Sequence, residues 1–205
     1  MKQPIRIFLA DDHPALRAGL AAILNSEPDM KVVGQAGSGR ETLEAIVDTD
    51  VFIVDLRMPE GDGVHVIRQL RERDPETRVL VLTTYDNEED VFRALEAGAR
   101  GFLLKDTTSE ELVNAIRQVH AGERHLPHAI ASRLADRLVR PSLTPRELDV
   151  LRLVAKGRTN KELASAMFVS EETVKSHMKA LFQKLGVHDR AEAVSVSLKR
   201  GIIRI

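Results

Sequence analysis

Five short apolar runs, rich in β-branched residues, alternate with segments of helical spacing across residues 1–120. Runs with two apolar faces fit the buried strands of a parallel sheet. Repeated strand–helix units of this kind fold into a parallel sheet with helices on both faces. The sequence therefore predicts an α/β, doubly wound, five-stranded parallel sheet for this part of the chain. The predicted strands are residues 5–9, 31–36, 51–54, 78–82 and 101–104.

Polar side chains follow four of the five predicted strands, at the point where each strand ends. Because ligands of such folds bind outside the carboxyl ends of the strands, we expect these groups to converge on one site. Taken singly, an aspartate after a strand is usually a turn or cap residue, and a lysine is usually solvated. The set as a whole indicates a functional site. Its members are Asp11 and Asp12 after the first strand, Asp55 after the third, Thr83 after the fourth and Lys105 after the fifth.

Three carboxylates, a hydroxyl and an ammonium at one edge suit the capture of a phosphoryl group. Clustered carboxylates repel one another unless a hard cation neutralises them, and Mg²⁺ binds through few carboxylates while keeping some waters. One carboxylate can then attack phosphorus and form an aspartyl-phosphate. The hydroxyl and the ammonium can hold the phosphoryl oxygens. We therefore expect Mg²⁺ as the cofactor of this site.

Residues 1–120 resemble the receiver domains of two-component signalling proteins, which have a flavodoxin-like fold. The resemblance implies that Asp55 accepts a phosphoryl group from a phosphohistidine on a sensor histidine kinase. It rests on Asp11-Asp12, on Asp55-Leu56-Arg57-Met58-Pro59 with Gly61 and Gly63, on Thr83, and on Lys105 at the end of 101–105.

The same resemblance implies a set of metal ligands. Asp12 and Asp55 would ligate Mg²⁺, with Asp11 acting through a water molecule and the Arg57 backbone carbonyl as a further ligand. Arg57 stands two residues after Asp55, at a position that influences how long the phosphoryl group survives in such receivers.

Three further residues receive roles from this likeness. Thr83 and Lys105 would bind the phosphoryl group. Phe102 stands where the family keeps a switch aromatic, often Tyr. A contact that needs a phenolic hydroxyl is therefore excluded, while rotation of the ring is not.

The charge of the chain is unevenly distributed, although the net charge is only −1. Residues 141–205 carry 12 Lys and Arg against 7 Asp and Glu, whereas residues 1–140 carry 18 against 24. This asymmetry indicates two modules with different partners. Cysteine is absent, which excludes disulfides, cysteine-ligated zinc and thiol catalysis. No apolar run approaches the ~20 residues of a membrane span and no secretory signal is evident, so we expect a cytoplasmic protein with no membrane partner.

Residues 142–205 carry the start and stop signals of four helices. Thr144 and Thr159 each begin a capping box, Ser170 can cap a third helix, and the fourth runs over residues 190–200. Gly157 and Gly186 are the expected stops of the first and third helices. A short helix, a tight turn and a longer helix form a helix-turn-helix, so we predict a smaller all-α domain of four helices.

The third of these helices has two different faces. One is an apolar core stripe, and the other carries lysines and short polar groups that can enter the major groove of double-stranded DNA. The alternative is a solvated helix face, which accounts for most lysine stripes. The core stripe is Val174, Met178, Leu181, Phe182 and Leu185, and the polar stripe is Lys175, Lys179 and Gln183, with Ser176 beside it.

This second domain resembles the LuxR-type helix-turn-helix, and a receiver joined to it is the arrangement of a NarL/FixJ-type response regulator. The likeness rests on residues 143–147 through Gly157, on 160–164 and on 170–185. It implies that Lys175, Ser176 and Lys179 face the bases, that Thr173, His177, Asn160 and Lys161 lie near the DNA backbone, and that Val194 and Leu198 carry a dimer contact.

The predicted domains are a receiver over residues 1–121, a linker with a short helix over 122–141, and a DNA-binding domain over 142–205. The linker helix is expected from the spacing of Ile130, Leu134 and Leu138. We expect a phosphorylation-dependent transcription regulator that is not an enzyme and that forms a homodimer when phosphorylated or bound to DNA.

Two alternatives compete with this interpretation. An aspartate-nucleophile phosphatase would also place an aspartate after a strand, but it usually needs a second carboxylate two residues later, where this chain has Arg57. The other alternative is a signalling module whose helical domain binds protein. The lysine stripe argues against it, and DNA binding measured across salt concentrations would decide between the two.

Overall fold

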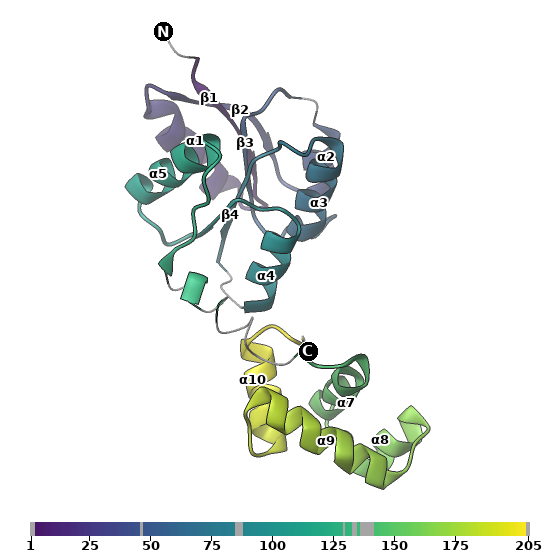
Figure 1. Ribbon diagram of the computed structural model, residues 1–205. Coiled ribbons are helices and arrows are strands. Elements are labelled where there is room, and N and C mark those ends of the chain that lie inside the picture. The colour runs from purple at the N-terminus through teal and green to yellow at the C-terminus, as the bar shows by residue number, and fades with distance from the viewer. Residues whose placement is uncertain are drawn as a thin grey trace. The chain divides into compact units, whose positions relative to one another are not determined.

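The computed structural model describes residues 3–45, 47–84, 88–128, 130–132, 135 and 142–203. This part of the chain forms two compact units, the first built mainly from residues up to Ala131 and the second mainly from residues after it (Figure 1). Among the helices in the described ranges, none is long and apolar enough to cross a bilayer.

The first unit contains a five-stranded sheet in the order β2-β1-β3-β4-β5, with every pair parallel. This confirms the predicted fold class. The strand order reverses between β1 and β3, which is where ligands bind in such sheets. The strands are β1 Ile5–Ala10, β2 Met30–Ala36, β3 Val51–Val54, β4 Val79–Thr83 and β5 Gly101–Leu104.

Helices cover both faces of the sheet (Figure 1). On one face, Leu24 of α1 and Ile116 of α5 are fully buried against apolar side chains of the strands. The other face is covered by α2, α3 and α4. Each residue of β4 is at most 3% exposed, as expected of a central strand. The helices are α1 Pro14–Ser26, α2 Gly39–Glu44, α3 Gly63–Arg73, α4 Glu88–Glu96 and α5 Ser109–His120.

The first residues of the predicted linker extend the sheet beyond β5. His125 donates its backbone N–H to the Arg100 carbonyl at 3.0 Å, and its carbonyl accepts from the Phe102 N–H at 2.9 Å. Ile130 is buried as well. Residues 123–128, 130 and 131 therefore belong to the first unit. Leu134 and Leu138 of the predicted linker helix lie outside the described residues.

Within the described residues 142–203, the second unit contains four helices, as predicted. Thr144 and Thr159 both form complete capping boxes, and the left-handed Gly186 ends the third helix. The core is formed by apolar side chains from all four helices, with Leu151, Leu163, Val174 and Leu181 fully buried. The helices are α7 Pro145–Ala155, α8 Asn160–Met167, α9 Glu171–Leu185 and α10 Arg190–Lys199.

Candidate functional site

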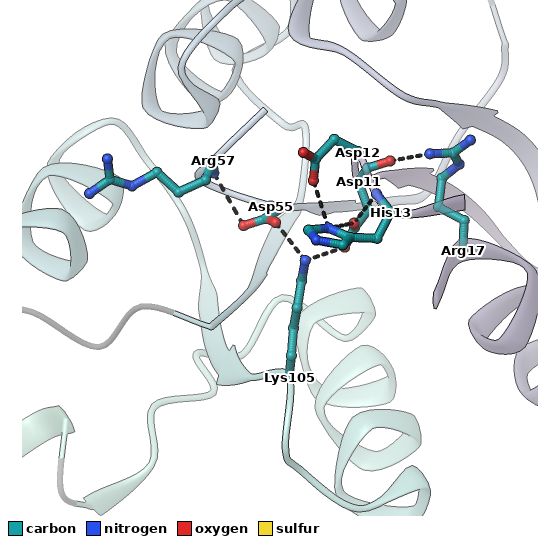
Figure 2. A network of polar contacts seen from close by, with 7 residues as sticks. All are labelled: Asp11, Asp12, His13, Arg17, Asp55, Arg57 and Lys105. Atoms are coloured by element: carbon teal, nitrogen blue, oxygen red, sulfur yellow. Dashed lines mark hydrogen bonds and ion pairs between the residues drawn. The ribbon is translucent and has the colours of Figure 1, made fainter. Parts of the chain in front are cut away.

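An acidic pocket lies at the carboxyl edge of the sheet (Figure 2). Because β1 and β3 are neighbours with Ala10 opposite Val54, the residues that follow them are brought side by side. The Asp55 backbone N–H donates to the Ala10 carbonyl at 2.8 Å, which fixes this arrangement. One ligand atom from each of Asp11, Asp12, His13 and Asp55 lies within 4.8 Å of the others.

Lys105 lies between two of these carboxylates. Its Nζ is 2.7 Å from Asp11 Oδ2 and 2.6 Å from Asp55 Oδ2, and all three side chains are buried. Burial disfavours the charged ammonium, but the hydrogen bonds to Asp11 and Asp55 outweigh this effect and raise the pKa of Lys105. The ammonium thus stays charged and reduces the repulsion between the two acids.

The loop after β3 is folded closely around Asp55. The Arg57 backbone N–H donates to Asp55 Oδ1 at 3.2 Å. At Gly63, the first residue of α3, a Cβ atom would overlap the Asp55 carbonyl oxygen. A side chain at this position is therefore excluded unless the backbone that carries Asp55 moves.

The Arg57 side chain points away from the acidic pocket (Figure 2). Its guanidinium pairs at 2.8 Å with Asp90 Oδ2 of α4, whose side chain is buried. Arg93 of α4 lies 3.6 Å from Asp62, the residue that caps α3. These two ion pairs connect the loop that follows the candidate phosphoacceptor to α4.

His13 is part of the pocket, although the sequence interpretation did not include it. Its backbone N–H donates to Asp11 Oδ1 at 2.8 Å, and its Nδ1 lies 2.7 Å from Asp12 Oδ1. The Arg17 guanidinium donates to the Asp11 carbonyl. The signal for His13 was its position directly after the two aspartates.

Thr83 and Phe102 also occupy the positions expected from their strands. Thr83 ends β4 and is fully buried, and its carbonyl accepts the Lys105 backbone N–H at 2.9 Å. The last residue of β4 is therefore joined to the first residue after β5. Phe102 in β5 is fully buried opposite Val81.

The donor set of the pocket fits a hard cation. Three carboxylates offer oxygen ligands within a small volume, and oxygen is the donor atom that such cations prefer. The pocket could therefore bind a metal ion, as its sequence pattern indicated.

The exposed face of α9 carries the predicted DNA-binding residues. Thr173, Lys175, Ser176 and Lys179 are exposed, and His177 is half-buried. Lys175 Nζ lies 3.7 Å from Glu172 Oε2, an exposed pair that solvent screens strongly.

A groove of about 970 Å³ runs along this face of α9, and Lys175, Lys179 and Asn160 line it. Lys161, next to Asn160 in α8, is exposed. The structure thus brings residues from the beginning of α8 and the middle of α9 to one surface. In α10, Val194 is half-buried and Leu198 is 38% exposed.

Both units match known families. Residues 7–117 match the response regulator receiver domain, and residues 141–197 match the bacterial regulatory proteins of the luxR family. The chain belongs to the NarL/FixJ-type two-component response regulators. Members of this family of response regulators are transcription regulators, which argues against the phosphatase alternative.

Relatives of this response regulator match it over nearly their whole length. The uncharacterized transcriptional regulatory protein YhcZ of Bacillus subtilis is 42% identical, with 95% of this chain and 96% of that protein covered. The oxygen regulatory protein NreC of Staphylococcus epidermidis is 36% identical, with 97% and 99% covered.

A solved structure of RcsB from Salmonella enterica serovar Typhimurium is also similar to this response regulator. It is bound to a promoter in the presence of the phosphomimetic BeF3⁻. The two chains are 27% identical with a TM-score of 0.75, and the match covers 97% of this chain and 100% of that one.

Proposed function

We propose that this response regulator is switched by phosphorylation of Asp55 and then controls transcription by binding double-stranded DNA through α9. The observation that carries the proposal is the meeting of Asp11, Asp55 and Lys105 at one edge of the sheet. It provides a nucleophile, a cation and an acidic metal site in contact with one another, which is what phosphoryl capture requires.

Asp55 accepts the phosphoryl group from a phosphohistidine of a sensor histidine kinase. A carboxylate oxygen of Asp55 forms the new P–O bond as the P–N bond to the kinase histidine breaks, and the bonding pair stays on the departing imidazole nitrogen. The hydrogen bond from the Arg57 N–H to Asp55 Oδ1 supports this role, because it orients the carboxylate for attack.

Mg²⁺ is the metal that we propose for the pocket. Asp12 and Asp55 would hold it directly, with Asp11 acting through water and the Arg57 carbonyl as a further ligand. When bound, the ion would neutralise phosphoryl oxygens during the transfer. The three clustered carboxylates support this proposal.

Thr83 and Lys105 bind the phosphoryl group after the transfer. The Lys105 ammonium already contacts Asp55, so a short movement brings it to a phosphoryl oxygen. Thr83 moves together with Lys105, because its carbonyl accepts a hydrogen bond from the Lys105 backbone N–H. Phe102, in the strand that leads to Lys105, serves as the switch aromatic through the orientation of its ring.

The second unit reads DNA with the exposed face of α9. Lys175, Ser176 and Lys179 contact base edges, whereas the other predicted residues contact the backbone: Thr173, His177, Asn160 and Lys161. The exposure of the lysines and the groove beside them support these roles. Val194 and Leu198 of α10 form the contact between two copies on DNA, and their accessible apolar surface supports this.

We infer a receiver over residues 1–121, a linker over 122–141 and a DNA-binding domain over 142–205, with the start of the linker attached to β5 through the backbone of His125. The protein acts in the cytoplasm, where a sensor kinase and DNA are both accessible.

Selection of bound sequences from random DNA duplexes, with and without acetyl phosphate, tests the proposal. We expect one enriched motif with two half-sites roughly one helical turn apart, and stronger enrichment with the donor. Asp55→Asn should give the same motif with no response to the donor. An equal response of both proteins to acetyl phosphate would disprove the role of Asp55, and the absence of any enriched motif would disprove the DNA-binding role.

A further inference from the structure

Phe168 is the most exposed large apolar side chain in the described part of the chain. It lies directly after α8, in the turn of the helix-turn-helix, and 96% of its surface is accessible. The next most exposed large apolar residues, Ile23 and Val47, reach only 39%. A phenyl ring that is held almost entirely in water gains nothing from folding of this chain.

The backbone of Phe168 is unfavourable for this residue type. Its φ of 55° and ψ of 46° lie in the left-handed region, which glycine or asparagine usually occupies at the end of a helix. A bulky residue in such a conformation is an outlier that points to a function. Neither the backbone nor the burial of Phe168 favours the ring, which points to a partner outside the chain.

A groove of about 650 Å³ lies beside Phe168, between the turn and α7. Leu153, Met167 and Val169 give it an apolar lining. Three exposed cations line it, Arg146 and Arg152 of α7 and Lys156 directly after this helix. They outnumber the single acidic residue of the groove, Asp149, which lies 3.7 Å from Arg152.

This groove is separate from the one along α9. Among the described residues that line them, the two grooves have none in common. The α9 groove includes Asn160 at the beginning of α8, whereas the second groove includes Met167 at its end. A ligand in the second groove can therefore be bound while α9 faces DNA.

We propose that this second groove, with Phe168 at its border, binds an acidic segment of RNA polymerase, the protein assembly that a transcription regulator encounters at a promoter. Arg146, Arg152 and Lys156 would pair with carboxylates of the segment. Phe168 would pack against an apolar side chain of it. A DNA phosphate would also attract the cations, but it would leave the ring in water, so the ring favours a protein partner.

Photo-crosslinking on DNA tests this proposal. The full-length protein, with a benzophenone amino acid at position 168, is mixed with purified RNA polymerase holoenzyme on a duplex that it binds. The same group at Ile23 is the control. We expect a crosslink from position 168 that maps to a polymerase segment rich in Asp and Glu. A crosslink to DNA, to a second copy of the chain or to a basic polymerase segment, or no crosslink, would overturn the proposal.

Two variants separate this role from folding and DNA binding. Phe168→Asn removes the ring but suits the left-handed backbone, so the domain should fold. We expect about tenfold weaker recruitment of polymerase to the regulator–DNA complex, with unchanged affinity for DNA. Arg152→Glu should also weaken recruitment of polymerase without a change in DNA affinity. Lys31→Glu makes the same charge change on β2 of the first unit and should leave recruitment unchanged. Undiminished recruitment with Phe168→Asn would contradict the proposal, as would a loss of DNA affinity that accounts for the weaker recruitment.

Discussion

The ammonium of Lys105 lies 2.6 Å from a carboxylate oxygen of Asp55, although fifty residues of sequence separate the two. The same ammonium contacts Asp11 at 2.7 Å. In this state the candidate phosphoacceptor is already paired with a cation, and its second oxygen accepts the Arg57 N–H. The acidic pocket is therefore ordered before any phosphoryl group arrives.

Replacement of the acceptor carboxylate should abolish phosphorylation. Asp55→Asn keeps a hydrogen-bond acceptor for the Arg57 N–H but removes the nucleophile. We expect no base-labile phosphate from acetyl phosphate or a donor kinase. Asp106→Asn is the control, because Asp106 is exposed and follows Lys105 directly. Equal labelling of Asp55→Asn and the wild-type protein would refute the assignment.

Gly63 should be intolerant of a side chain. Gly63→Ala places a methyl group against the Asp55 carbonyl, which should cost roughly 1–3 kcal/mol of stability by overpacking. Urea denaturation measures the loss, and phosphorylation by acetyl phosphate should slow as well.

Gly19 in α1 offers the matched control for that substitution. A Cβ at Gly19 meets no atom within 4 Å, so Gly19→Ala should stabilise the helix by about 0.5–1 kcal/mol. Equal effects of the two substitutions would contradict the prediction for Gly63.

Asp50 should make the stability of the first unit sensitive to acid. Its side chain accepts hydrogen bonds from the Arg6 guanidinium at 2.6 and 3.0 Å, which lower the pKa of Asp50 to about 2. A lowered pKa stabilises the fold above the ordinary pKa of aspartate, and this contribution is lost as the pH falls from about 4 through about 2.

Asp50→Asn should therefore lower the free energy of unfolding at pH 7 by about 1 kcal/mol, once solvent screening is taken into account. The difference from the wild-type protein should shrink below pH 4 in urea titrations. Asp48→Asn removes the same charge from the same partner, but Asp48 is 83% exposed and should matter less. A constant difference across pH 2–7 would contradict the prediction.

Lys175 and Lys161 should affect DNA binding in different ways. Lys175→Ala should cost roughly 1–3 kcal/mol and relax base choice at one position, because Lys175 is assigned to a base edge. Lys161→Ala should weaken binding to all DNA sequences alike. It should also reduce by about 1 the slope of the log binding constant against the log salt concentration. Binding to matched and mismatched duplexes across salt concentrations separates the two. Identical profiles for both variants would contradict the assignment of Lys175.

Leu198→Glu should prevent pairing on DNA. It places a charge on the accessible apolar surface of α10 and leaves the buried Ala193 and Ser197 in place. We expect binding to a single half-site to persist while the gain from a second half-site disappears. Light scattering of the complexes checks the stoichiometry. A dimer of Leu198→Glu on the full site would place the contact elsewhere.

The sheet and the acidic edge could be predicted because their signals are local. Each strand is a short apolar run, and Asp55 and Lys105 directly follow two of them. The helix boundaries of the second unit were predictable for the same reason, since Thr144 and Thr159 are capping residues that act within one turn.

Contacts that depend on tertiary placement could not be predicted. Arg57 pairs with Asp90 across 33 residues, and nothing in the spacing of the two indicates this. His125 joins the edge of β5 through backbone atoms alone, which leave no trace in the residue types. Phe168 adopts a left-handed backbone that its residue type disfavours, so its residue type gave no indication of this conformation.

The hydrogen bond from the Lys105 N–H to the Thr83 carbonyl has a practical consequence for protein engineering. It joins the end of β4 to the start of the segment after β5, so that a displacement of one strand end is passed to the other. A hybrid sensor that takes only one of these two segments from a different receiver would combine segments that do not fit each other. The two should be transplanted together, as a single cassette.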